Sequence, residues 1–68
     1  MREAAILERL AQGVQTIRAI VEVIYRDTDP RLHGAAALTV QAHLERLIDL
    51  GLVGTDGNPT MDALYQRL

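Results

Sequence analysis

The polar side chains best placed to do chemistry are Thr39, His43 and Arg46, which recur at steps of three and four residues. At this spacing they lie on one face of an amphipathic helix, with Gln41 at the edge of that face. Hydroxyl, imidazole and guanidinium groups on one helix face can contact the edges of bases in the DNA major groove. We therefore predict that this face is a candidate binding surface.

The charges around this face argue against sequence-specific DNA recognition. It carries one Arg, and Glu45 and Asp49 lie close by. The following segment, TDGNPTMD, carries two acidic residues and no basic one, so it offers no cation for phosphate contacts. The chain as a whole has a net charge of −2, whereas nucleic-acid binders usually carry a basic surplus. We favour a solvated or protein-docking face and keep nucleic-acid binding as the alternative.

No arrangement of residues points to catalysis or metal binding within this chain. The two histidines, His33 and His43, are ten residues apart, which separates them by about 280° around one helix. There is no Cys or Ser, and no HExxH pattern. Asp27 and Asp29 fall in a turn, where a helix-capping role is expected. We predict that the chain has no catalytic residue, cofactor or metal site, and that His43 is an exposed surface residue.

Apolar periodicity predicts three helices, over residues 2–12, 16–25 and 31–50. The apolar stripes consist of Ile6, Leu7 and Leu10; of Ile17, Ile20, Val21 and Ile24; and of Ala37, Val40, Leu44, Leu47 and Ile48. Thr16 is a suitable N-cap, and Asp29 before Pro30 can cap the next helix. Gly13 and Gly51 are placed to end the first and third helices.

The last part of the chain predicts a hairpin over residues 52–68. Residues 52–55 are typical of a short strand, and residues 56–59 are turn formers. Residues 62–68 fit either a helix or a strand in which Leu64, Gln66 and Leu68 share a face. We favour the strand, because the strand at 52–55 needs a partner. The predicted fold class is mainly α (α+β): a winged helix with a hairpin wing, forming a single domain over residues 1–68.

The bulk composition limits the class of protein. Sixty-eight residues make one small domain, and the absence of Cys excludes disulfides. Hydrophobic residues make up 49% and aromatic residues 3%, which predicts a core of Leu, Ile, Val and Ala. The sequence contains no apolar run long enough to span a membrane and no signal-peptide pattern, so we expect a cytoplasmic location.

A set of residues spread over positions 2–53 forms a recognisable combination. Its members are Arg2, Ile6, Leu7, Gly13, Thr16, Ile17, Val23, Ile24, Tyr25, Leu32, His33, Ala36, Val40, Ala42, His43, Leu44, Leu47, Gly51 and Val53. This combination resembles the small winged-helix domain at the C-terminus of metallo-β-lactamase-fold hydrolases, in the glyoxalase-II-like branch that includes the β-lactamase-like-2 proteins. After residue 54 the likeness weakens, and only residues 65–68 are similar to the family's final strand.

The resemblance implies a parent hydrolase whose HxHxDH motif lies upstream and binds zinc or a similar divalent metal. It implies that the domain packs on the catalytic domain and helps to shape the substrate cleft, with no chemistry of its own. Some relatives hydrolyse thioesters or other esters, and some cut RNA. A free-standing nucleic-acid-binding regulator remains the alternative. A homodimer formed through the first helix and the small-residue run at 34–37 is compatible with either function.

Overall fold

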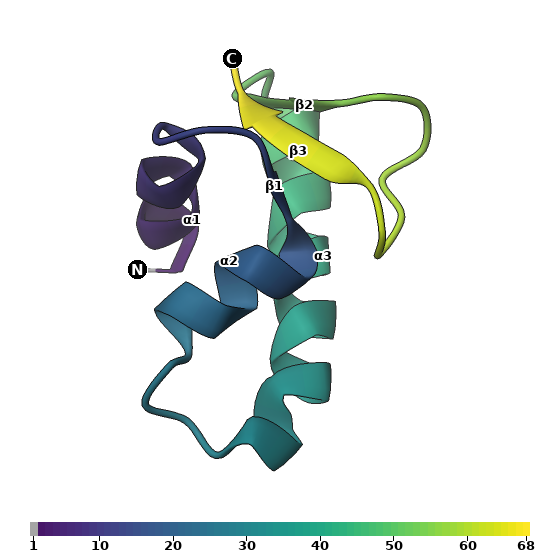
Figure 1. Cartoon of the computed structure of the whole chain (residues 1–68). Helices are drawn as coiled ribbons and strands as arrows, with labels where there is room; N and C mark the ends of the chain where they lie inside the picture. Colours follow the sequence, from purple (N-terminus) through teal and green to yellow (C-terminus); the bar gives the residue numbers. More distant parts are fainter. Residues whose placement is uncertain (1) are drawn as a thin grey trace.

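The computed structural model describes residues 2–68, which form a mostly helical domain with a small antiparallel sheet (Figure 1). The elements in chain order are α1 (Arg2–Leu10), β1 (Gln15–Thr16), α2 (Ile17–Ile24), the 3-10 turn η1 (Pro30–Leu32), α3 (His33–Asp49), β2 (Val53–Thr55) and β3 (Leu64–Arg67). This order confirms the predicted winged helix. The first helix ends two residues before the predicted position 12, and a 3-10 turn replaces the predicted first turn of the third helix.

The helix ends follow from the capping residues. The Thr16 hydroxyl accepts a hydrogen bond from the Ala19 N–H at 3.2 Å, and Asp29 Oδ1 accepts one from the Arg31 N–H at 2.9 Å. Gly51 ends α3 with a φ of +76°, a conformation that glycine adopts without a steric penalty. The Gly51 N–H then bonds to the Ile48 carbonyl at 2.9 Å, and the next N–H bonds back to the Leu47 carbonyl at 3.0 Å. These two bonds satisfy carbonyl groups that the end of a helix leaves open.

The sheet has the order β1-β3-β2, so the last strand of the chain lies in the middle. Both pairings are antiparallel, with Thr16 opposite Leu64 and Val53 opposite Arg67. The favoured strand over the last residues is therefore present, from Leu64 to Arg67. Its inward side chain is Tyr65, which is fully buried.

Leu64, Gln66 and Leu68, which the alternation of the sequence places on one face of the last strand, lie on the outward face of the sheet. Leu64 and Leu68 are 57% and 65% exposed, so they point away from the core. Tyr65 takes the inward position because its ring buries a large apolar area and its hydroxyl still reaches the Thr60 carbonyl at 2.7 Å. The prediction of a purely aliphatic core is therefore wrong at this one residue.

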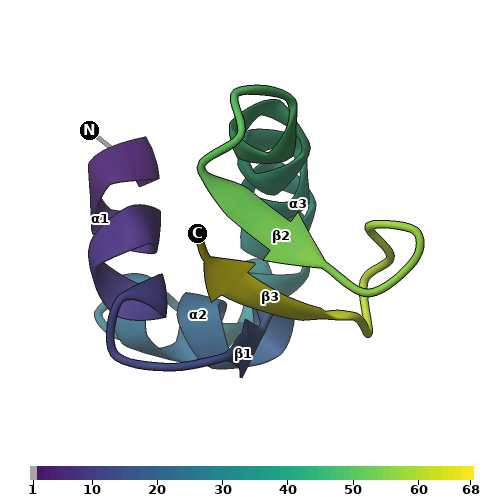
Figure 2. The ribbon, with the colours of Figure 1, turned by 90° about the horizontal axis from the view of Figure 1, so that it is seen from above.

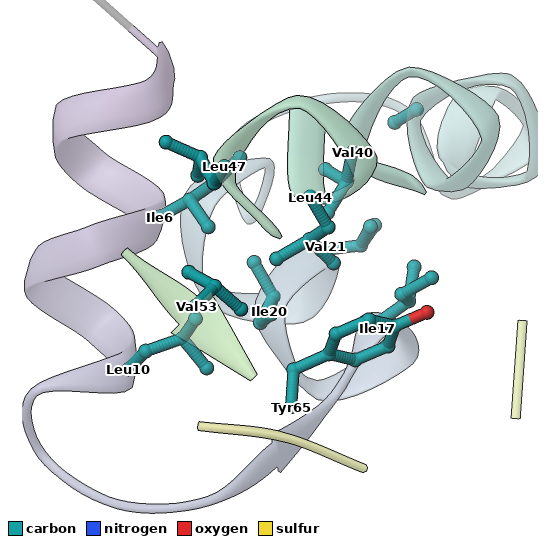
Figure 3. Packing of buried hydrophobic residues seen from close by; sticks show 11 residues of the cluster. Ile6, Leu10, Ile17, Ile20, Val21, Val40, Leu44, Leu47, Val53 and Tyr65 are labelled. Atoms are coloured by element: carbon teal, nitrogen blue, oxygen red, sulfur yellow. The ribbon is translucent and has the colours of Figure 1, made fainter. Parts of the chain in front are cut away.

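The core lies where the three helices meet the inner face of the sheet (Figure 3). Its buried members are Ile6, Leu10, Ile17, Ile20, Val21, Ala36, Val40, Leu44, Leu47, Val53 and Tyr65. Most of them belong to the predicted stripes. Seen from above, α1 lies at the left, α3 lies behind β2, and α2 lies between the two helices at the bottom of the view (Figure 2). None of the helices within residues 2–68 is long and apolar enough to cross a membrane.

Candidate functional site

A buried carboxylate joins α1 to the predicted binding face of α3. Glu3 is only 8% exposed, and its Oε2 lies 2.9 Å from His43 Nδ1 and 3.1 Å from Arg46 Nε. Arg46 Nε is also 3.3 Å from the other carboxylate oxygen. We call these three residues the Glu3 cluster. It connects the first turn of α1 with two successive turns of α3.

The local sequence explains why Glu3 reaches α3. Glu3, Ile6 and Leu10 are spaced by three and four residues, so Glu3 lies on the same face of α1 as two core residues. A carboxylate in this position is costly unless it is paired and hydrogen-bonded. The His43 hydrogen bond lowers the pKa of Glu3, burial opposes this shift, and the Arg46 charge and hydrogen bond lower the pKa further. Glu3 therefore favours the ionised form.

His43 is half-buried rather than exposed, which corrects the sequence-based prediction. Its side chain is 32% exposed and bonds to Glu3. The periodicity of α3 places His43 at the edge of that helix's apolar stripe, one turn from Val40 and Leu47, and Glu3 of α1 covers this edge. Arg46 keeps 64% of its side chain exposed, although its Nε is held by the carboxylate. Both side chains are thus tied into the fold.

The other two predicted residues are not brought to this cluster. The Thr39 hydroxyl donates to the Ala35 carbonyl of its own helix at 3.3 Å. Gln41 Nε2 donates to the Pro59 carbonyl at 3.1 Å, and so connects α3 to the wing loop. The candidate face therefore divides into separate contacts: His43 and Arg46 bond to Glu3, whereas Thr39 and Gln41 bond to backbone carbonyls elsewhere.

The wing offers no positive charge at its tip. The loop between β2 and β3 carries Asp56 and Asp62, both exposed, and contains no basic residue. Arg67, on β3, turns back toward the base of the hairpin, where its Nη1 donates to the Leu52 carbonyl at 2.8 Å. This geometry does not provide the phosphate contacts that a DNA-binding wing makes.

The described residues contain no group of three His, Cys, Asp or Glu side chains that could hold a metal ion. His33 bonds through Nε2 to the Tyr25 carbonyl at 3.1 Å, which fixes the turn between α2 and α3. Within residues 2–68 every buried side-chain nitrogen or oxygen has a hydrogen-bond partner. The hydrogen bonds of these polar side chains therefore stabilise the fold.

A second surface feature lies between α2 and the N-terminal half of α3. It is a groove of about 800 Å³ that the wing loop closes at one end. The residues that form its floor and walls include Arg18, Val21, Glu22, Gly34, Ala37 and Leu38. One feature of the sequence points to this groove: the run of small residues at 34–37.

Glu3 was missed as a site residue, although the sequence contained a signal. An acidic residue on the apolar face of a helix, one turn before Ile6, must find a partner across the interface. The spacing Glu3, Ile6, Leu10 would have indicated a buried carboxylate.

A family model described as the beta-lactamase associated winged helix domain matches residues 16–60, which is more than half of the chain. The match includes α2, α3 and β2, whereas α1 and β3 lie outside it. It confirms the resemblance, although it begins at residue 16 rather than 2 and continues past residue 53. No curated protein and no solved structure matches the chain.

Proposed function

Because the chain belongs to the beta-lactamase associated winged-helix family, we propose that it is a non-catalytic accessory domain of a metallo-β-lactamase-fold hydrolase. It packs on the catalytic domain and helps to shape the substrate cleft. The catalytic domain supplies the reaction, through zinc or a similar divalent metal held by its own residues. The observation that carries this proposal is the family match over residues 16–60.

The Glu3 cluster supports a role in docking over a role in nucleic-acid binding. His43 and Arg46 are the two cationic or potentially cationic groups of the candidate face, and both bond to Glu3. An added phosphate would meet the negative charge of the Glu3 carboxylate beside both groups, and that charge opposes its binding. Because the wing tip is acidic as well, this surface offers little positive charge for binding phosphate.

The outer face of the sheet supports packing against a larger domain. Leu64 and Leu68 point outward from β3, and Val14 precedes the neighbouring strand β1; each is more than half exposed. Leu68 also covers Gly54, since its Cδ2 lies 3.1 Å from the position that a Cβ at residue 54 would take. Adjacent exposed apolar side chains of this kind mark interaction surfaces.

The coding sequence upstream of Met1 gives the first test. An in-frame continuation that carries HxHxDH is expected, and a stop codon with a ribosome-binding site directly before Met1 would contradict the proposal. With the catalytic domain in hand, the chain is then added to it in trans, and binding and turnover are measured.

A variant pair makes this test specific for the sheet face. Leu64→Asp should weaken binding to the catalytic domain, because it places a charge in the apolar contact. Val23→Asp is the matched control, since Val23 is 38% exposed and lies on α2, outside the sheet. Absence of binding and of any change in turnover with the unmodified chain would count against the accessory role.

A further inference from the structure

We propose that the groove between α2 and α3 is a self-association surface, whose occupant is the same groove of a second copy of this chain. The two copies meet across a two-fold axis, so that each presents one patch to its equivalent. The inference does not depend on the proposed accessory function, because it concerns a different surface from the outer sheet face. It rests on the shape, the charge and the size of the groove.

The shape of the groove is self-complementary. Leu38 lines it and is 63% exposed, so it projects from the wall as an apolar knob. One turn before it, no atom lies within 4 Å of the position that a Cβ at Gly34 would take, and Ala37, which also lines the groove, has only a methyl side chain. The small residues leave room for the α3 helix of a second copy, and for its Leu38. One patch thus contains both the projection and the space that receives it.

The charges at the rim are also self-complementary. Arg18 and Glu22 on α2 and Asp62 on the wing loop line the groove, and all three are exposed. We call these three residues the rim; none of them takes part in an ion pair with another described side chain. A two-fold interface sets each rim against its own copy, so it is favourable only if both signs of charge are present. Here Arg18 of one copy faces the acidic residues of the other.

The size of the groove predicts a weak dimer. Its lining comprises ten residues, whereas stable interfaces use about 20–30 residues on each side. Burying a typical area of about 800 Å² per partner would require almost a fifth of this chain's 4408 Å² surface. We therefore expect reversible dimers with a dissociation constant on the order of 100 µM.

Sedimentation analysis of the chain, from about 10 µM to about 1 mM, tests whether it associates in this range. The matched variants are Gly34→Gln and Ala35→Gln, which add the same side chain at adjacent positions. Gly34 lines the groove, whereas Ala35 is exposed and does not. Neither change threatens the fold, since both positions are helical and exposed, and glutamine is a better helix former than glycine and only slightly poorer than alanine. Gly34→Gln should weaken dimers roughly tenfold or more, and Ala35→Gln less than about twofold.

Charge reversal provides the second test. Arg18→Glu makes the rim entirely acidic, and the double change Glu22→Arg with Asp62→Arg makes it entirely basic. Each protein alone should be monomeric, and an equal mixture should form heterodimers that dissociate as salt is added. This outcome is the same whichever acidic residue meets Arg18. Circular dichroism of each variant checks that it remains folded.

Three results would overturn the proposal. The first is a strict monomer at all concentrations. The second is a wild-type dimer that Gly34→Gln leaves unchanged. The third is a folded acidic and basic pair that fails to associate in the mixture while the wild type does. Since none of these measurements involves a catalytic domain, failure here would leave the accessory function standing, and failure of that function would leave the dimer standing.

Discussion

The two halves of α3 differ in how the rest of the domain uses them. The C-terminal half lies beside α1 and the sheet, while the N-terminal half extends past α2, away from both (Figure 1). In the C-terminal half, His43 and Arg46 bond to Glu3. In the N-terminal half, Leu38 is 63% exposed and Gly34 faces open space. Both halves contribute core residues, but only the N-terminal half also presents an exposed apolar side chain beside open space.

This difference locates the surfaces that are free to act. The polar side chains of the C-terminal half look like binding residues in the sequence, but they hold α1 and the wing loop in place. In the N-terminal half, Ala37 belongs to the predicted core stripe, but it also lines a groove together with the exposed Leu38. Residue type alone therefore points to the C-terminal half as the binding surface, whereas the groove lies beside the N-terminal half.

The largest effect on stability should come from shortening a buried leucine in the C-terminal half of α3, compared with an exposed leucine in the N-terminal half. Leu44 is fully buried, so Leu44→Ala should lower the free energy of unfolding by about 2–5 kcal/mol. Leu38→Ala, at an exposed position, should change it by less than about 0.5 kcal/mol. Urea unfolding of the two variants measures both values. Equal losses would mean that the N-terminal half is packed as tightly as the other.

The glycines at the two ends of α3 should respond with opposite signs. Gly34 has helical backbone angles, so Gly34→Ala should stabilise the domain by about 0.5–1 kcal/mol through helix propensity. Gly51 has a φ of +76°, so Gly51→Ala should destabilise it by about 1 kcal/mol. Neither added Cβ would meet another atom within 4 Å, so the difference isolates the backbone conformation. Thermal unfolding, at a protein concentration low enough for the monomer to prevail, measures the stability change of each variant. Changes of the same sign in Gly34→Ala and Gly51→Ala would contradict this prediction.

The Glu3 cluster should produce a smaller effect that depends on pH. Glu3→Gln keeps the shape of the side chain but removes the charge, so we expect the melting temperature at pH 7 to fall by a few degrees. Glu8→Gln is the matched control on the exposed side of α1. Similar melting temperatures for these two variants would show that the cluster does not stabilise the fold.

The sign of the pH dependence follows from the lowered pKa of Glu3. The carboxylate stays ionised to a lower pH in the folded state than in the unfolded chain, and the His43 hydrogen bond is the largest cause of this lowered pKa. The added stability is therefore present above the unfolded pKa of Glu, about 4.3, and is lost as the pH falls through the lower folded value. As the pH falls below about 5, the free energy of unfolding of the wild type should decrease more than that of Glu3→Gln. Parallel acid profiles would contradict this.

Much of the fold could be predicted from local patterns. The stripes of α2 and α3, the Thr16 cap and the Gly51 end are properties of neighbouring residues, and the structure has them. The inward position of Tyr65 could not be read in the same way. In a strand the choice of face depends on what lies across the sheet, and the alternation of apolar residues favoured Leu64.

The candidate site was harder to predict, because it depends on which elements reach which part of α3. The pattern placed His43 and Arg46 correctly on one face of a helix. It did not show that α1 covers that face, since this depends on long-range packing of Glu3 against residues about 40 positions away along the chain. The groove is likewise formed by α2, α3 and the wing together, so no single segment carries its signature.

We propose that the polar groups of the α3 face hold the fold together and do not bind nucleic acid. Fluorescence anisotropy at low salt, with labelled single-stranded RNA and random duplex DNA, tests this. We expect no saturable binding at protein concentrations of tens of micromolar, whereas non-specific binders have dissociation constants of about 10⁻⁴–10⁻⁶ M at physiological salt and bind more tightly at low salt. Saturable binding in this range that Arg46→Ala abolishes would contradict it.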